Sequence, residues 1–393
     1  MKDLEDWIKL LSLSKYIMLV GFISQLTLFA NDDILSPNYK KDIDLSIKKI
    51  NIDGSKQKID WINPIRVSYE KDSLNSLDDI ETTTISINQP IFKSGGIYNV
   101  IKYSNSFKQY QTIDTTIRKK LLIKDATILL YQLKIIDINL NKQRLLIKNS
   151  QIDTKQKQEQ VINGILDVSF LNDSIIKLNQ NRLQLSNLNI QKQNLLNKFV
   201  NLTSQDYKLF KLPKLSLKNE QKLLDSNIYI QKSKLDVESK KYMKNMVLSK
   251  YLPEVSLTYN YNKNHNTNID NTNSGIRVSI PLDIKSYYDT QSSKISYLKS
   301  KLNSNIVKEQ EKNYLKYQIK QIFIIDNKLK IQSDTIDYYN KLLKQMRALK
   351  KNGLKTKDDL EILNNSKDIA KLDLEVFKLD KQIKLLEIYA RTN

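Results

Sequence analysis

The sequence predicts a mostly α-helical chain with a small β part, built from a duplicated helix–strand–strand–helix unit. The 393 residues include only 7 Gly and 6 Pro, so turns are few and the elements between them are long. These rare residues recur at one offset, because Pro64 and Pro253 lie 189 residues apart and so do Gly164 and Gly353. Between them run stretches with apolar residues at heptad spacing. A duplicated, largely helical chain follows from these observations.

The N-terminal segment has the features of an export signal. Residues 16–30 form a 15-residue apolar run that follows Lys2, Lys9 and Lys15 and ends at the small residue Ala30. We expect residues 1–30 to be a secretory signal peptide that is removed after export. The alternative is an uncleaved anchor helix, although 15 residues fall short of the ~20 that span a bilayer.

Each repeat contains two short runs in which apolar and polar residues alternate. In the second repeat, for example, Val255, Leu257 and Tyr259 alternate with polar residues. A period of two predicts strands with one apolar and one polar face, joined in pairs by polar hairpin loops. The predicted strands cover about 64–71, 80–92, 253–262 and 274–282. We expect residues 31–202 to form the first repeat and residues 203–393 the second.

Long helices with coiled-coil spacing follow the strand pairs. Leu122, Ala126, Leu129 and Leu133 step by four and three residues, which is typical of a coiled-coil seam. Two rods are expected over 93–162 and 283–351, each ~100 Å long at 1.5 Å per residue, with Gly164 and Gly353 at their C-terminal ends. Shorter helices are expected to pair with these rods, and they cover 165–200, 217–251, 354–390 and the N-terminal 36–62.

Four strands are too few to close a barrel, and this chain offers no second layer for their apolar faces. An open ribbon with one apolar face needs either a helical cover or closure in lipid with other copies. Because the helices are occupied by their own seams, we expect closure by oligomerisation. Three copies would supply 12 strands, an even number within the range of membrane barrels, and strands of about ten residues suit a tilted crossing.

Composition excludes several classes of function. Cys is absent, which removes disulfides, thiolate zinc sites and cysteine nucleophiles, and the single His265 cannot build a His-rich metal centre. We expect no cofactor, and no acid–base or metal constellation indicates an enzyme. The formal net charge of +21 would suit a protein whose function is to bind nucleic acid. We interpret the lysines as spread along helices, and the export signal also opposes that function.

This combination resembles the TolC-type outer membrane efflux protein family. The resemblance rests on INQPIFKSGG (87–96), VSIPLDI (278–284), YLPEVSLTYNY (251–261), VINGILDV (161–168) and KKNGLKTKDDLEIL (350–363). It implies a homotrimer with a 12-stranded transmembrane β-barrel and a periplasmic tunnel, an α-barrel of coiled-coil helices. It also implies an outer membrane exit duct of a tripartite efflux or type I secretion system, with a periplasmic adaptor protein and an inner-membrane pump as partners.

The resemblance further implies functional residues at the helix turns. In the family, the adaptor meets the glycine turns, and the matching residues here are Gly164, Ile165, Leu166, Gly353, Leu354 and Lys355. A ring of acidic residues often closes the tip as a periplasmic gate, and the candidates here are Asp358, Asp359 and Glu361. Phe170 stands where many relatives have Asp. Asp359 would equally suit a simple helix first-turn carboxylate, which the helix dipole favours.

A second class of function stays open at this point. An elongated periplasmic coiled-coil protein, a structural or adaptor protein without a pore, would also explain the heptads and the export signal. It would not explain four alternating strands placed in pairs between helices. Membrane fractionation and crosslinking separate the two, because the channel is a membrane-embedded trimer and the alternative is a soluble monomer.

Overall fold

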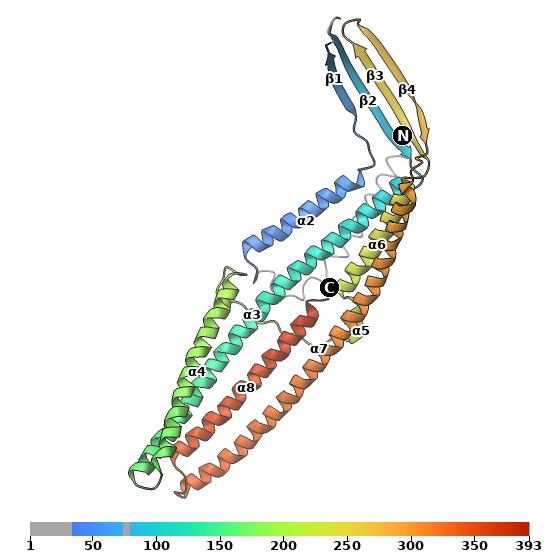
Figure 1. Cartoon of the computed structure of the whole chain (residues 1–393). Coiled ribbons are helices and arrows are strands. Elements are labelled where there is room, and N and C mark those ends of the chain that lie inside the picture. Colours follow the sequence, from blue (N-terminus) through green and yellow to red (C-terminus); the bar gives the residue numbers. More distant parts are fainter. Residues whose placement is uncertain (1–33, 74–78, 393) are drawn as a thin grey trace, which may run out of the picture. The chain divides into compact units, whose positions relative to one another are not determined.

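Long helices and one four-stranded sheet make up the described chain (Figure 1). The structure is a computed structural model that describes residues 34–73 and 79–392, so the expected signal peptide over 1–30 lies outside the described residues. The chain divides into two compact units. The sheet unit comprises Asp42–Ile117 and Asn227–Glu311. The helical unit comprises Arg118–Ser226, Lys312–Asn393 and the segment up to Lys41.

The sheet is antiparallel throughout, in the order β1-β2-β3-β4. Its strands are β1 (Arg66–Asp72), β2 (Ile80–Phe92), β3 (Glu254–Asn264) and β4 (Ile269–Ser279). The central pairing joins β2 of the first repeat to β3 of the second, with Ile85 opposite Tyr261. Each repeat therefore supplies one half of the sheet.

Strand β4 begins five residues before the range that the sequence indicated. Asn271, Asp270 and Ile269 continue the ladder opposite Asn262, Lys263 and Asn264, so the hairpin loop is only four residues long. The alternation of apolar and polar residues fails in this polar stretch, although the backbone pairing continues. Hydropathy therefore marked the end of the apolar face rather than the end of the strand.

Four helices pack side by side in the sheet unit, in the order α2, α3, α6, α7. Ser104 of α3 donates a hydrogen bond to the Gly54 carbonyl of α2 at 2.7 Å. Lys232 of α6 pairs with Asp114 of α3 at 2.5 Å, and the hydroxyls of Ser233 and Ser304 join α6 to α7 at 3.0 Å. These helices are α2 (Pro37–Lys58), α3 (Gly96–Ile162), α6 (Ile228–Ser249) and α7 (Lys285–Lys351).

The helical unit has the matching order α4, α3, α8, α7. Lys192 of α4 pairs with Asp137 of α3 at 2.7 Å, and Lys142 of α3 pairs with Asp373 of α8 at 2.8 Å. Lys381 of α8 then pairs with Asp326 of α7 at 2.6 Å. The additional elements of this unit are α4 (Val168–Val200), η3 (Tyr207–Leu209), α5 (Glu220–Asp225) and α8 (Lys357–Tyr389).

The core of the helical unit lies between these helices. Leu223, Leu315, Ile322, Leu385 and Ile388 form one buried cluster. Elsewhere in the unit Tyr131 is fully buried, and its hydroxyl donates to the Pro213 carbonyl. Burial raises the pKa of Tyr131 to about 12, because an apolar surrounding disfavours the phenolate.

The helix lengths display the duplication directly. Helices α3 and α7 both have 67 residues, and α4 and α8 both have 33. The predicted fold class is confirmed for the chain, which is mostly helical, with four antiparallel strands and a repeated helix–strand–strand–helix unit. Within the described residues, none of the helices combines the length and apolar character needed to cross a bilayer.

Candidate functional site

The sheet has one apolar and one polar face. Cross-strand rows such as Val67–Ile85–Tyr261 and Leu257–Ile276 place aliphatic and aromatic side chains together on the same face. The intervening rows, such as Ser86–Asn260–Asn273, place Ser, Thr, Asn and Arg side chains on the opposite face. Because strand side chains alternate strictly, the two faces differ in character from the helix end of the sheet to the row of Tyr261, beyond which both faces are largely polar.

The apolar face of the sheet has no cover from the described chain. Val67 is 68% exposed, Ile276 is 70% exposed and Val278 is 68% exposed. Soluble proteins seldom expose a contiguous apolar patch of this kind without a partner or a membrane. Strands β1 and β4 are also both edge strands, so each presents unpaired backbone groups. In a single chain, the apolar face of the sheet is therefore uncovered and both of its edges are unpaired.

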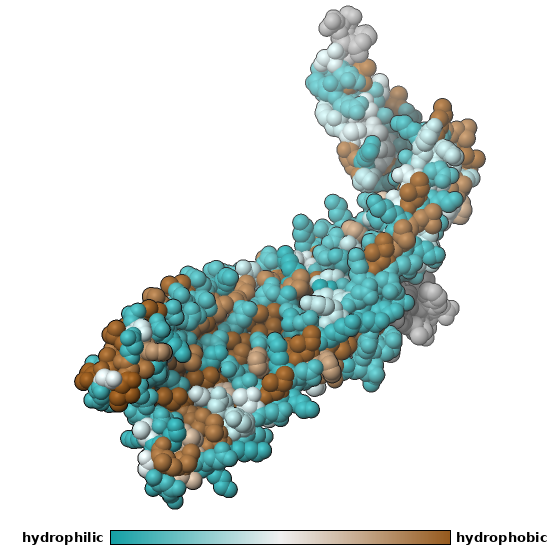
Figure 2. Space-filling view, turned by 60° about the horizontal axis from the view of Figure 1, so that its bottom comes forward, coloured by the Kyte–Doolittle hydropathy of each residue, from teal (hydrophilic) through white to brown (hydrophobic). Residues whose placement is uncertain are grey.

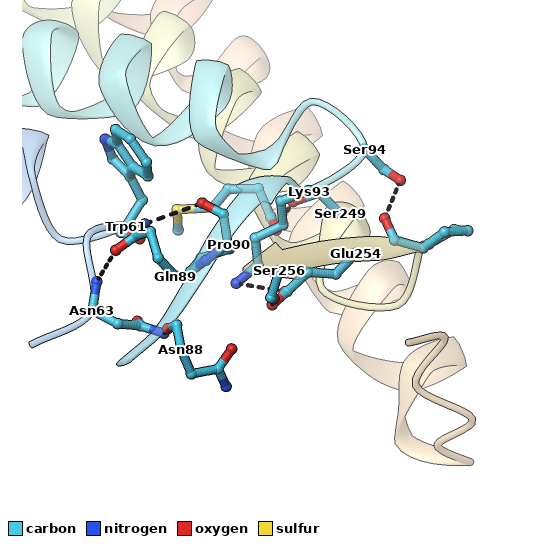
Figure 3. Close-up of polar contacts among 12 residues, drawn as sticks. Trp61, Asn63, Asn88, Gln89, Pro90, Lys93, Ser94, Ser249, Glu254 and Ser256 are labelled. Carbon is cyan, nitrogen blue, oxygen red and sulfur yellow. Dashed lines mark hydrogen bonds and ion pairs between the residues drawn. The ribbon is translucent and has the colours of Figure 1, made fainter. Parts of the chain in front are cut away.

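Gln89, just before Pro90, fixes the place where the first strand pair meets its helices (Figure 3). Its Oε1 accepts a hydrogen bond from the Asn63 backbone N–H at 3.0 Å, and its Nε2 donates to the Trp61 carbonyl at 3.4 Å. Asn63 also donates to the Asn88 carbonyl at 2.5 Å. These bonds satisfy backbone groups where Pro90 and a register shift interrupt the ladder.

A second set of contacts turns β2 into α3 (Figure 3). Ser94 and Gly95 adopt φ values of +44° and +81°, and of the two only Gly95 tolerates a positive φ without strain. The Ser94 hydroxyl donates to the Pro253 carbonyl at 2.6 Å, and Lys93 pairs with Glu254 at 3.2 Å. The INQPIFKSGG segment is therefore a structural corner that locks the first repeat to the start of β3.

The outermost helices of the helical unit carry exposed apolar stripes. On α7, Tyr317, Ile324, Ile331 and Tyr338 follow one another at seven-residue intervals, and we call them the α7 stripe. On α4, Ile176, Leu183 and Ile190 follow the same interval and form the α4 stripe. Each stripe lies on the side of its helix opposite the buried positions. Both outer helices of this unit thus resemble coiled-coil partners that lack their mates.

The sheet unit repeats this arrangement. Its outermost helices are α2 and α7, and both expose apolar residues on the side away from their neighbours. The exposed residues of α2 and its end are Leu45, Ile52 and Ile59, and those of α7 are Ile295, Leu298, Leu302 and Ile306. In each unit, therefore, one edge of the helical layer is chemically complementary to the other edge.

The two predicted docking turns share one backbone geometry. Gly164 and Gly353 have φ values of +69° and +74°. The following residues, Ile165 and Leu354, each donate their N–H to a carbonyl five residues back, at 2.9 and 3.0 Å, which is the Schellman pattern. A Cβ added at either glycine would meet no atom within 4 Å, so the backbone angle alone requires glycine.

The apolar residues of these turns face solvent. Ile165 is 74% exposed and Leu354 is 68% exposed, Lys355 is exposed, and Leu166 is partly buried. Hydrophobic surface gathers at the left-hand end of the molecule, where α3 turns into α4 (Figure 2). The exposed side chains there include Ile162, Val168 and Phe170.

The three predicted gate carboxylates have different environments. Asp359 accepts the Thr356 N–H at 3.0 Å, while the Thr356 hydroxyl accepts the Asp359 N–H at 3.1 Å, so the pair forms a capping box. That backbone bond lowers the pKa of Asp359 below its ordinary value. Asp359 therefore serves as a first-turn carboxylate of α8. Asp358 precedes it and is partly exposed.

Glu361 links two helices of the helical unit. Its carboxylate lies 2.5 Å from the Lys148 ammonium of α3, and this hydrogen-bonded cation lowers the pKa of Glu361. One turn further along α8, the buried Asn365 donates to Asn149 of α3 at 2.7 Å. Polar contacts thus join α3 and α8 at this level.

Solved outer membrane proteins share this arrangement. The outer membrane protein VceC from Vibrio cholerae is 12% identical and matches with a TM-score of 0.73 over 91% of this chain and 93% of VceC. A membrane protein from Pseudomonas aeruginosa is 10% identical, with a TM-score of 0.71 over 91% and 87% of the two chains. The Campylobacter jejuni CmeC outer membrane channel is 14% identical, with a TM-score of 0.69 over 91% and 83%.

The chain has the outer membrane channel fold. The resemblance to the TolC-type proteins is confirmed at the level of the fold. No protein-family model and no curated protein matches the sequence. The channel fold is therefore evident from the arrangement of strands and long helices, which tolerates almost complete replacement of side chains as long as their periodicity is kept.

Thr356→Ala is expected to destabilise the first turn of α8 by about 1 kcal/mol, because the substitution removes the N-cap acceptor of the capping box. Hydrogen exchange of the amides of Asp359 and Leu360 measures this effect. Thr335→Ala is the matched control, since the Thr335 hydroxyl bonds a carbonyl within α7 and caps nothing. Equal protection of the α8 amides in all three proteins would contradict the assignment.

The sequence interpretation missed two features that the channel fold displays. Leu315 and Ile322 mark the internal seam of α7, and the residues two positions later in the same heptad form the α7 stripe, which we did not predict. The C-terminal part of α7 also clusters lysines, whereas we expected lysines spread along the helices, so that expectation is wrong for this segment. Both signals are visible in the sequence once each heptad position is examined separately.

Within the described residues, no group of His, Asp and Glu could hold a metal ion.

Proposed function

We propose that this chain forms the outer membrane exit duct of a tripartite efflux or type I secretion system. The observation that carries the proposal is the uncovered apolar face of a sheet that is open at both edges. A surface of this kind is stable in lipid only when the sheet closes on itself and no backbone group is left unpaired. The outer membrane channel fold supplies the context for that closure.

Closure follows from joining copies edge to edge. With four antiparallel strands, β4 runs opposite to β1, so β4 of one copy can extend the sheet through β1 of the next. The stripes on the edge helices can pair in the same way, α7 of one copy with α2 and α4 of the next. Three copies then give a homotrimer with a 12-stranded barrel above a periplasmic tunnel of helices.

In this assembly the polar face of the sheet lines the passage. Its side chains are mostly short and uncharged, with Thr84, Asn260 and Asn273 as examples. A polar wall lets hydrated substrates pass without stable binding, whereas the apolar face contacts lipid. Transport by such a tube requires no covalent step, and the energy would come from an inner-membrane pump.

The helix turns and the nearby carboxylates are the regulated end of the proposed duct. A periplasmic adaptor would dock on the turns that contain Gly164 and Gly353, where Ile165 and Leu354 are exposed. Asp358, Asp359 and Glu361 would form the gate region. The Lys148–Glu361 ion pair would hold α8 against α3 in the closed state, and adaptor binding would favour the state in which this pair is broken.

Glu361→Gln is expected to raise the open fraction of the reconstituted channel by about two- to fivefold, because the substitution removes one half-exposed ion pair per copy. Single-channel recording in a planar bilayer measures the open fraction, and Asp368→Asn is the matched control, because Asp368 pairs with Lys371 of the same helix. The depressed pKa of Glu361 means that the ion pair is present above the ordinary value of 4.5. Lowering the pH through the pKa of the folded state should protonate Glu361 and open the wild-type channel. Identical currents in wild type and Glu361→Gln would remove Glu361 from the gate.

Fractionation and conductance test the proposal as a whole. The chain is expected in the outer membrane as a trimer after crosslinking, and the purified trimer is expected to conduct ions across a planar bilayer. A soluble monomer without conductance would instead support the elongated coiled-coil protein without a pore.

A further inference from the structure

The C-terminal end of α7 and the turn into α8 form a strongly basic surface. Residues 341–357 contain seven basic residues and no acidic residue. All seven are exposed, and none forms an ion pair within the described residues. We call them the basic turn cluster, and they are Lys341, Lys344, Arg347, Lys350, Lys351, Lys355 and Lys357.

Helical spacing concentrates part of this charge on one side of α7. Lys341, Lys344, Arg347 and Lys351 are separated by three, three and four residues, so their side chains project from the same side. Exposed cations at such distances repel one another, and each contributes to a positive potential that extends about one Debye length, ~10 Å at 0.1 M salt. A surface of this kind gains stability when an anionic partner covers it.

The corresponding turn between α3 and α4 has the opposite chemistry, although its backbone is the same. Residues 160–173 contain no basic residue, and their only charges are Asp167 and Asp173. The exposed side chains there are largely apolar, with Ile165 and Phe170 as examples. A partner that contacts both turns must therefore offer anionic groups to one and apolar groups to the other.

We propose that the basic turn cluster is a docking surface for an acidic protein segment, and that the apolar α3–α4 turn binds an apolar part of the same partner. The inference rests on the proposed function, because it assigns a chemistry to the adaptor that would dock on these turns. Nucleic acid or an anionic bilayer fits less well, since both would face the carboxylates of Asp167 and Asp173 without neutralising groups. A protein partner can vary its surface from one turn to the next.

The test uses the full chain in detergent, with one fluorophore in the turn. Because the sequence has no Cys, Asn352→Cys provides a single labelling position beside Gly353. The probe is an oligo-glutamate peptide of about 20 residues, titrated in 0.05 and 0.3 M NaCl. The turn variant combines Lys350→Glu, Lys351→Glu, Lys355→Glu and Lys357→Glu.

The matched control makes the same change of charge elsewhere on α7. It combines Lys294→Glu, Lys299→Glu, Lys301→Glu and Lys308→Glu, all of which are exposed in the sheet unit. The turn variant is expected to bind the peptide at least tenfold more weakly than wild type, and the control variant within about twofold. Binding to wild type should weaken at the higher salt concentration.

Several results would overturn the inference. The first is equal binding of the peptide by wild type and the turn variant, and the second is equal weakening in both variants. A third is discrimination between the variants by a 20-base-pair DNA duplex or by phosphatidylglycerol vesicles, without discrimination by the peptide. A wild-type chain that conducts in a planar bilayer but fails the peptide test would remove the docking chemistry and leave the channel proposal intact.

Discussion

Ile324→Glu combined with Ile331→Glu is expected to convert the proposed trimer into monomers. Both residues belong to the α7 stripe, which the proposed assembly buries against α4 of the next copy. A buried carboxylate without a partner is strongly unfavourable in an apolar interface, and a cyclic trimer contains six such substitutions. The apparent dissociation constant should rise by at least ~100-fold, since each 1.4 kcal/mol corresponds to a factor of ten.

Native mass spectrometry in detergent and crosslinking of intact cells measure this change. The matched control is Phe323→Glu with Lys330→Glu, which places the two carboxylates one residue earlier on α7, about 100° around the helix. Phe323 is exposed but lies outside the stripe. A double variant at 324 and 331 that remains trimeric would show that the edges of the helical layer do not meet in the assembly.

Ile276→Arg is expected to abolish stable insertion of the sheet in the membrane. Ile276 lies on the apolar face of β4, opposite Leu257, and is 70% exposed in the single chain. An arginine on the lipid face near the middle of a bilayer costs about 2–4 kcal/mol in a membrane barrel. The substitution occurs in every copy, so the penalty is multiplied by the number of subunits.

The control substitution is on the same strand but on the other face. Asn273→Arg adds the same side chain to the polar face, where water is expected, and should leave insertion unchanged. The amount of protein in the outer membrane fraction after urea washing measures both variants. Equal loss for Ile276→Arg and Asn273→Arg would indicate that neither face of the sheet contacts lipid.

The sequence alone predicted those parts of the fold that depend on periodicity. Alternation around Val255 and Leu257 marked β3 because a half-buried strand needs that pattern, and the heptads of α3 marked a long helix for the same reason. The first part of β4, residues 269–273, was not predicted, because backbone pairing continues there through polar residues, which leave no hydropathy signal. Patterning indicates what a segment buries, and not every paired segment buries apolar surface.

The site was less accessible from the sequence, since its residues act through local geometry. The spacing Thr356-x-x-Asp359 is typical of a capping box, whereas nothing in the order of residues 356–361 indicates that Glu361 pairs with Lys148 on another helix. A first-turn role for Asp359 is the simpler expectation from the sequence, and the structure shows that cap. The partner of Glu361 is more than 200 residues away in the sequence, and only the folded helical layer brings the two together.

The even number of strands has a consequence for copy number. Since each chain contributes four alternating strands, a ring of two, three or four chains would close with equally good backbone pairing. Strand pairing therefore cannot count the chains in a ring. That number must be determined by how sharply each helical layer bends, which depends on the size of side chains between helices, as at Gly54, where an added methyl group would lie 3.0 Å from Lys108. The number of chains in the ring would then depend on the curvature of the helical layers and not on the strands.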